Sequence, residues 1–122
     1  MKFHEMTDDN SNYISAYEEN WLKIKNNKYT ESILIFNDEI IKIGKSSMDQ
    51  INKLILSKHN SKKLELIIIA SKDNCEMKSI ENYAEIIEQQ IGFEFMTSES
   101  AYRTFNIVLS EDREVAILVK LS

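Results

Sequence analysis

Cysteine and histidine carry much of the nucleophilic and metal chemistry of proteins, and this sequence has few of either. Its one cysteine is Cys75, and its two histidines are His4 and His59. A reactive cysteine needs a base or a positive charge beside it, whereas Cys75 follows Asn74 and precedes the acidic Glu76. These residues also lack the spacing of a zinc motif. The sequence therefore predicts no catalytic residue and no metal site.

One short segment, Gly44-Lys45-Ser46, resembles the end of a nucleotide-binding phosphate loop. That loop also requires an upstream glycine at a set spacing, and the only other glycine in the chain is Gly92. We therefore interpret the segment as the exit from a strand followed by a helix cap, and we predict no cofactor. Carboxylates are plentiful, but their number alone does not indicate an acid–base pair.

Length and composition are those of an ordinary globular domain. The chain has 122 residues, of which 43% are hydrophobic and 29% are charged. This length predicts one domain over residues 1–122, with residues 1–7 frayed. No apolar run approaches the roughly 18 residues of a membrane span, and the N-terminus turns acidic where a signal peptide would turn apolar. With a single cysteine, these features predict a cytoplasmic protein that does not enter a membrane.

The net charge of −5 argues against a nucleic-acid partner, because phosphate binding needs a basic surface. The charge is also uneven, since residues 41–78 are rich in lysine and the last third is acidic. Two acidic groups stand out, one along a predicted helix flank and one in a predicted turn. Their members are Glu81, Glu85, Glu88, Glu111, Asp112 and Glu114. Solvated surface is the simplest interpretation; the alternative is that these residues bind a basic protein partner.

Residues 64–70 are the segment around which the predicted fold is built. Their sequence, Leu-Glu-Leu-Ile-Ile-Ile-Ala, is dense in aliphatic side chains and is bounded by polar residues. A short run of this kind predicts a strand that is buried on both faces, in the interior of a sheet.

Hydrophobic periodicity and turn signals predict the other elements. The predicted helices are residues 8–24, a segment from a cap at Ser46 or Ser47 to Asn60, and residues 80–91 with Ser79 as cap. The other predicted strands are residues 32–36, 39–43, 93–95, 102–109 and 114–121. The order αββαβαβββ predicts a single α+β domain, with a mixed or mostly antiparallel sheet of five or six strands and about three helices.

Specific signals support three of these assignments. In residues 8–24, aromatic and aliphatic side chains recur at helical spacing. These are Tyr13, Ile14, Tyr17, Trp21 and Ile24. We interpret them as core contacts, with a platform for stacking bases as the alternative. Asn37-Asp38 indicates a two-residue hairpin turn. Residues 102–109 and 114–121 alternate in hydrophobicity and are predicted to form an antiparallel hairpin.

In size, acidity and lack of a catalytic motif, the chain resembles the small immunity proteins of bacterial toxin systems, such as those of contact-dependent growth inhibition. The resemblance implies a cytoplasmic, non-enzymatic protein that binds one cognate toxin domain, often a nuclease, and blocks its active site or another essential surface. That partner would be basic, and the acidic residues named above would be the place where it binds.

Three alternatives remain open from the sequence. A small carboxylate-dependent enzyme would need a deep, convergent polar pocket. A regulatory or assembly module could form homodimers through an edge strand such as residues 102–109. Binding could instead use the lysine-rich middle of the chain against an acidic partner. The lysines concerned are Lys53, Lys58, Lys62 and Lys63.

Overall fold

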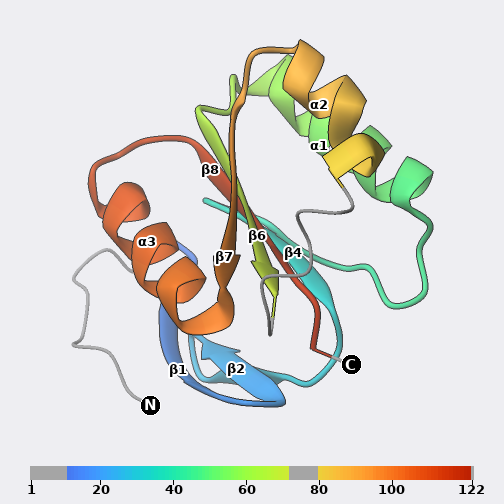
Figure 1. The fold of residues 1–122 in the computed structure, drawn as a ribbon. Helices are drawn as coiled ribbons and strands as arrows, with labels where there is room; N and C mark the ends of the chain where they lie inside the picture. The colour runs from blue at the N-terminus through green and yellow to red at the C-terminus, as the bar shows by residue number, and fades with distance from the viewer. Residues whose placement is uncertain (1–10, 72–79, 122) are drawn as a thin grey trace.

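Two β-sheets and three helices make up the part of the chain that the computed structural model describes, residues 11–71 and 80–121 (Figure 1). The strands are β1 (Ile14–Glu18), β2 (Trp21–Ile24), β3 (Asn27–Tyr29), β4 (Ile33–Phe36), β5 (Ile40–Lys42), β6 (Leu66–Ser71), β7 (Gly92–Thr97) and β8 (Val115–Val119). The helices are α1 (Met48–Ser61), α2 (Ala84–Glu88) and α3 (Ser98–Ser110). The predicted class, an α+β domain with a mixed sheet, is confirmed.

The larger sheet has the strand order β5-β4-β8-β6-β7. Strand β6 lies inside it and pairs in parallel with both β7 and β8, while β4 is antiparallel to β5 and β8. Ile67, Ile68 and Ile69 are fully buried in β6. Because side chains alternate along a strand, Ile68 enters the core on one face of the sheet, and its two neighbours enter the core on the other. The predicted internal strand is therefore confirmed.

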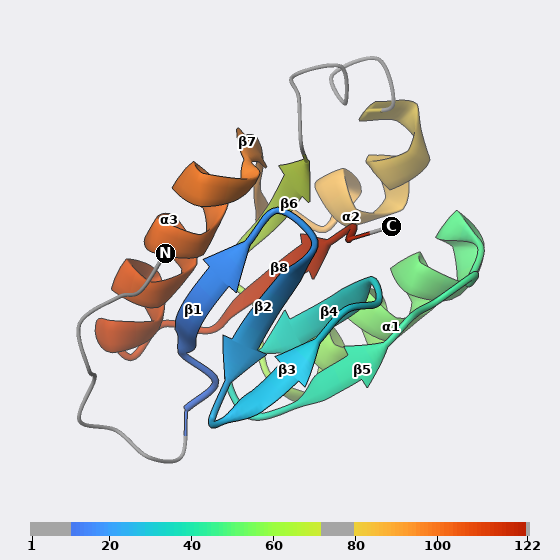
Figure 2. The same cartoon turned by 90° about the horizontal axis from the view of Figure 1, so that it is seen from below.

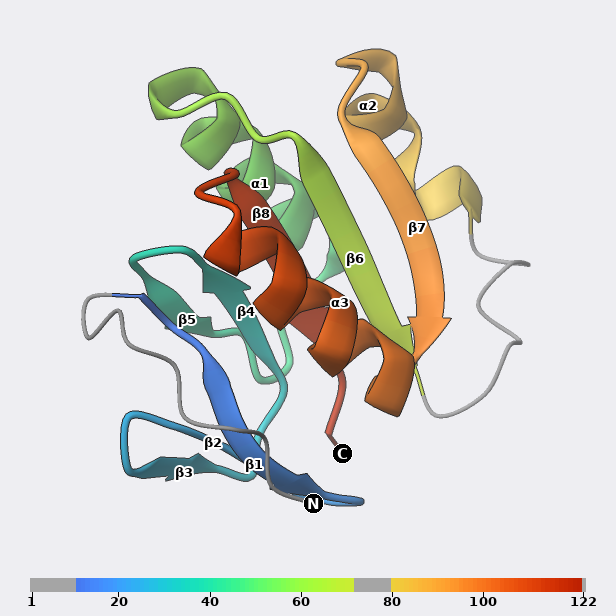
Figure 3. The ribbon, with the colours of Figure 1, turned by 90° about the vertical axis from the view of Figure 1, so that its left-hand side faces the viewer.

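Each face of this sheet is covered by different elements. Figure 3 shows α3 and the three-stranded sheet β1-β2-β3 on the near side, with α1 and α2 behind. The connection from β6 to β7 carries α2 across the far face, and the connection from β7 to β8 carries α3 across the near face. Each helix buries its apolar side against the sheet, so the two cores are separated by the sheet itself.

The predicted helix over residues 8–24 is wrong, because this region forms the strands β1 and β2, which continue into β3 as a meander (Figure 2). A register shift lies between Ile14 and Ala16, so that Ile14 and Tyr17 both point into the core three positions apart. This spacing imitates a helix. Lys25 and Asn26, whose φ angles are 51° and 70°, form the tight turn between β2 and β3.

The predicted strand over residues 102–109 is also wrong, because these residues lie in α3. The buried side chains recur at helical spacing. They are Ala101, Tyr102, Phe105, Asn106, Val108 and Leu109. Ile107, which the alternating pattern placed on the apolar face, is 55% exposed. The predicted terminal hairpin is therefore wrong, since β8 instead pairs in parallel with β6, and residues 102–109 do not supply an edge strand.

The hairpin around Asn37-Asp38 is confirmed, with β4 and β5 antiparallel. The start of α1 is also as predicted, since Ser47 and Gln50 cap it reciprocally through their side chains and backbone N–H groups. The third predicted helix is shorter than expected, because residues 80–83 form a 3₁₀ turn before α2. Residues 1–7, Cys75 and the predicted cap Ser79 lie outside the described residues.

Candidate partner-binding surface

The acidic group of the predicted third helix lies on the solvent side of α2 and of the 3₁₀ turn before it. Glu81, Glu85 and Glu88 are exposed, while Tyr83 and Ile86 are fully buried against the sheet. Residues three and four apart share one side of a helix, so the three carboxylates form one row opposite the buried side. The structure therefore presents these three predicted residues together to solvent.

One flank of α2 is apolar and exposed. The Tyr83 ring lies 5.0 Å from the Phe93 ring and 5.8 Å from the Phe95 ring, which turns this flank toward β7. Ile80 and Ile87, three residues before and four after Tyr83, continue the flank and are 43% and 40% exposed. Exposed apolar side chains that lie together are typical of protein interaction sites.

Strand β7 forms an edge of the larger sheet, and among the described strands it pairs only with β6. It has six residues, Gly-Phe-Glu-Phe-Met-Thr, without lysine or proline. Natural edge strands are commonly protected by short length, lysine, proline or a bulge. The opposite edge strand, β5, has three residues and ends in Lys42. Within residues 11–71 and 80–121, the edge of β7 is thus the less protected of the two.

Together these features define what we call the α2–β7 edge surface. It consists of the apolar residues Ile80, Ile87, Phe93 and Phe95 and the exposed carboxylates Glu81, Glu85, Glu88 and Glu94. In Figure 3, α2 lies behind the beginning of β7, and the turn before it reaches beyond the outer edge of the strand. Through the contacts of Tyr83 with Phe93 and Phe95, the apolar flank lies on the side of the sheet to which these two rings point. The sequence suggested Glu81, Glu85 and Glu88 but not Glu94, and the edge position of β7 depends on the strand order.

The second predicted acidic group lies in the turn between α3 and β8, separate from the first. Glu111 and Asp112 are exposed there, but Glu114 is half-buried, contrary to the expectation that all six carboxylates lie in solvent. Arg113 partly neutralises the turn, because its Nε is 3.2 Å from Glu65 Oε1 and its Nη1 is 3.6 Å from Glu111 Oε1. This group therefore offers less free negative charge than its sequence indicates.

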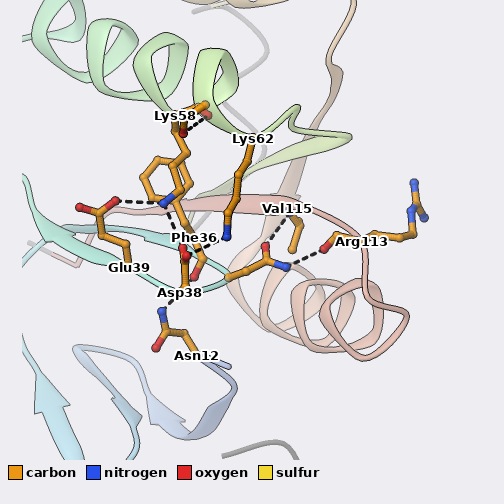
Figure 4. A network of polar contacts seen from close by, with 10 residues as sticks. Asn12, Phe36, Asp38, Glu39, Lys58, Lys62, Arg113 and Val115 are labelled. Atoms are coloured by element: carbon orange, nitrogen blue, oxygen red, sulfur yellow. Dashed lines mark hydrogen bonds and ion pairs between the residues drawn. The ribbon is translucent and has the colours of Figure 1, made fainter. Parts of the chain in front are cut away.

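The lysine-rich middle of the chain is partly paired within the molecule (Figure 4). Lys58 Nζ lies 2.9 Å from Asp38 Oδ1 and 3.1 Å from Glu39 Oε1, and Lys62 Nζ lies 3.0 Å from Asp38 Oδ2. Lys58 also lies over the Phe36 ring, 5.1 Å from its centroid. Two of the four lysines proposed for an acidic partner thus hold α1 against the β4–β5 hairpin.

A depression of about 350 Å³ lies between the β1–β2 turn and the start of α3. It is lined by Tyr17, Glu18, Glu19, Thr97, Ser98 and Glu99. Burial, followed by the charge of Glu99, raises the pKa of the Tyr17 hydroxyl, which therefore stays protonated at neutral pH. Glu99 Oε1 also lies 3.0 Å from Arg103 Nη2. The Tyr17 phenol and the ion-paired Glu99 carboxylate thus line this depression from β1 and α3.

One sequence match relates the chain to known proteins. Residues 14–119 match the family described as "Protein of unknown function (DUF498/DUF598)". The chain belongs to the DUF498/DUF598 family. Among curated proteins, no match was found.

Solved structures share the fold of this DUF498/DUF598 protein. A protein from Bordetella parapertussis has a TM-score of 0.74 and 17% identity, covering 92% of this chain and 97% of its own. A Mth938-like domain from Bordetella pertussis has a TM-score of 0.72 and 15% identity, covering 99% and 92%. A Bartonella henselae protein described as an outer membrane protein has a TM-score of 0.69 and 21% identity, covering 93% and 97%. At these identities the likeness is one of fold.

The resemblance to toxin-immunity proteins is wrong. The family match extends over residues 14–119 and the structural relatives include Mth938-like domains, and neither indicates toxin immunity. Small size, acidity and the lack of a catalytic motif are common to many unrelated domains, so they do not identify a family. Separately, no helix in the described ranges of this DUF498/DUF598 protein is long and apolar enough to cross a membrane.

The ion pairs around Asp38 give this DUF498/DUF598 protein a specific pH dependence. Hydrogen bonds from Lys58 and then Lys62 lower the pKa of Asp38 from 3.8 to about 2. When the pKa of a carboxyl group is lower in the folded state than in the unfolded state, its ionised form stabilises the fold at pH values above the unfolded-state pKa. This contribution is lost as the pH falls through the folded-state pKa. We therefore expect Asp38→Asn to lower the unfolding free energy at pH 7 by about 1 kcal/mol or less, since the pair is exposed to solvent.

Urea unfolding at pH 7, 4 and 2 in low salt measures this effect. The difference between the wild type and Asp38→Asn should be complete at pH 7 and should disappear between pH 4 and pH 2. Asp112→Asn is the control, because Asp112 is exposed in a turn, and this variant should unfold within about 0.5 kcal/mol of the wild type at pH 7. A difference for Asp38→Asn that is constant from pH 7 to pH 2 would contradict the assigned role of its charge.

Proposed function

We propose that this DUF498/DUF598 protein is a non-catalytic binding domain that docks one basic protein partner on the α2–β7 edge surface. The observation that carries the proposal is the combination of an unprotected edge strand with an exposed apolar flank and a row of carboxylates. Apolar contact supplies most of the affinity in such interfaces, and surrounding charges select and steer the partner.

Charge supports a basic protein as the partner. Glu81, Glu85 and Glu88 lie in one exposed row beside the apolar flank, and the net charge of the chain is −5. Lys58 and Lys62, which an acidic partner would need, are already paired with Asp38. Nucleic acid is disfavoured for the same electrostatic reason. The proposal places the protein in the cytoplasm, in keeping with its single cysteine.

Charge reversal tests this proposal. The protein captured from a cell extract by the wild-type domain is purified, and its affinity for each variant is measured by calorimetry at low and high salt. Glu85→Lys combined with Glu88→Lys should weaken binding at least about tenfold and reduce its salt dependence, because charges at the rim of an interface act through long-range attraction.

The matched control is Glu19→Lys combined with Glu31→Lys. Both residues are exposed, and they lie in or beside the three-stranded sheet, which is on the other face of the domain from α2. This control makes the same change in net charge and should bind almost as the wild type does. Equal affinity and salt dependence for wild type and the Glu85/Glu88 variant would exclude the α2–β7 edge surface as the docking site.

A further inference from the structure

We infer that the partner binds by adding a β-strand to the edge of β7 that no other described strand pairs with, and that this added strand alternates apolar and basic side chains. The inference rests on the proposed function, since it specifies how the α2–β7 edge surface would be occupied. Three observations support it: the direction of the N–H and C=O groups of β7, the different side chains on the two faces of this strand, and the charges around it.

The backbone of β7 has alternate groups that point away from the sheet. Gly92 N–H donates to Glu65 C=O at 3.0 Å, and β7 continues in parallel register with β6. In a parallel pair, every second residue directs both its N–H and C=O to the neighbour. Gly92, Glu94 and Met96 therefore face β6, and the N–H and C=O groups of Phe93 and Phe95 point outward. An added strand would bond to these two residues.

The two sides of the β7 edge have different chemistry. Phe93 and Phe95 pack in the core on the side of α1 and α2, where both rings contact Tyr83. The exposed Ile80 and Ile87 share the helical side of Tyr83 by their spacing. Glu94 points to the opposite side and is exposed. Because side chains alternate along a strand, an added strand would place one set on the apolar flank of α2 and the other set beside Glu94. Apolar residues suit the first position and basic residues the second.

The charges also decide between a foreign strand and a second copy of this chain. Two copies joined through β7 would bring Glu94 and the α2 carboxylates of each copy close to those of the other. Like charges placed opposite each other in a sheet are destabilising. A strand that carries lysine or arginine would instead place these side chains beside the exposed Glu94. The occupant favoured by the structure is therefore an extended basic segment of another protein.

Synthetic peptides of ten residues provide the probe. One peptide alternates valine and lysine, a second alternates valine and glutamate, and a third has the composition of the first with the valines and lysines in separate blocks. Binding is measured by fluorescence anisotropy, and the contact site by ¹H–¹⁵N spectra of the domain. We expect the alternating valine–lysine peptide to bind at least about tenfold more tightly than the other two, with the largest shifts at the amides of Phe93 and Phe95.

N-methylation of the peptide tests the backbone bonds without changing the domain. Methyl groups on one alternate set of peptide amides should abolish binding, and methyl groups on the other set should have little effect, because only one set faces β7. Sensitivity at the valines indicates antiparallel addition, and sensitivity at the lysines indicates parallel addition. Equal effects of the two methylated sets would overturn strand addition.

A pair of variants gives the same test from the side of the domain. Phe95→Ala removes the ring, whereas Phe95→Pro removes the ring and the outward N–H, which edge strands tolerate. We expect Phe95→Pro to bind the valine–lysine peptide at least about tenfold more weakly than Phe95→Ala, with circular dichroism confirming that both are folded. The methylated peptides decide the question if Phe95→Pro does not fold.

The outcomes separate this inference from the proposed function. If the alternating and block peptides bind equally, or if neither methylated set loses binding, strand addition is wrong. The proposed function then still stands, provided that Glu85→Lys with Glu88→Lys weakens binding. If that charge-reversed variant binds the captured partner as the wild type does, the proposed function is itself wrong.

Discussion

Replacing Ile68 with alanine is expected to lower the unfolding free energy by about 2–5 kcal/mol, the range for truncating a fully buried aliphatic side chain. Ile68 is 0% exposed, and its strand, β6, is paired on both sides. It lies between Glu94 of β7 and Ile117 of β8 in the register of the sheet, with α3 covering its face. The cavity left behind cannot close easily, because every neighbouring element is itself held in the sheet or packed on it.

Urea denaturation with matched isoleucine variants measures this effect. Ile107→Ala is the control, because Ile107 is 55% exposed on α3 and alanine favours helix, so its effect should stay within about 0.5 kcal/mol. A loss of less than about 1 kcal/mol for Ile68→Ala would show that β6 is not the buried centre of the sheet.

Replacing Asn106 with leucine is expected to lower the unfolding free energy by about 1–3 kcal/mol for each buried backbone group that loses its partner. Asn106 is 2% exposed in α3, and its side-chain amide bonds to both backbone groups of Ile14, as a neighbouring strand would. Its Nδ2 donates to Ile14 C=O at 2.9 Å, and its Oδ1 accepts from Ile14 N–H at 2.9 Å. Since Ile14 is fully buried, water cannot replace these bonds without local opening.

Hydrogen exchange distinguishes this role from simple packing. The amide of Ile14 should exchange faster in Asn106→Leu by more than the change in global stability explains, because β1 loses its attachment to α3. Asn60→Ala is the control, because Asn60 is exposed near the end of α1, and neither stability nor exchange at Ile14 should change appreciably. Unchanged protection at Ile14 in Asn106→Leu would mean that the side-chain bonds do not hold β1.

Short-range patterns in the sequence determined three elements correctly. The aliphatic run of residues 64–70 predicted β6, the Asn37-Asp38 turn predicted the β4–β5 hairpin, and Ser47 with Gln50 predicted the start of α1. Each of these elements is determined by residues that are close in sequence: a strand buried on two faces, a turn conformation and a helix cap. The row Glu81, Glu85 and Glu88 was visible for the same reason, since helical spacing is local.

Two segments were misassigned because their local patterns fit two structures. The register shift between Ile14 and Ala16 places Ile14 and Tyr17 inward at a helical spacing within a strand. In α3, alternating Phe105, Ile107 and Leu109 imitated a strand, although Tyr102, Phe105 and Leu109 also fit a helix. Packing against the larger sheet decided between these readings. Secondary-structure propensity is a weak determinant when a segment can bury an apolar face either as a helix or as a strand.

Features that join distant parts of the chain were decided by the tertiary structure alone. Asp38 pairs with Lys58 and Lys62 across about 20 positions of sequence, so two lysines of the lysine-rich middle are held within the molecule. Among the described strands, β7 is at an edge because β6 and β8 occupy the centre of the sheet. This strand order follows from long-range pairing and from the packing of α2 and α3 on opposite faces. The sequence alone could therefore indicate acidic residues for a partner, but the apolar flank and strand edge beside them depend on the complete fold.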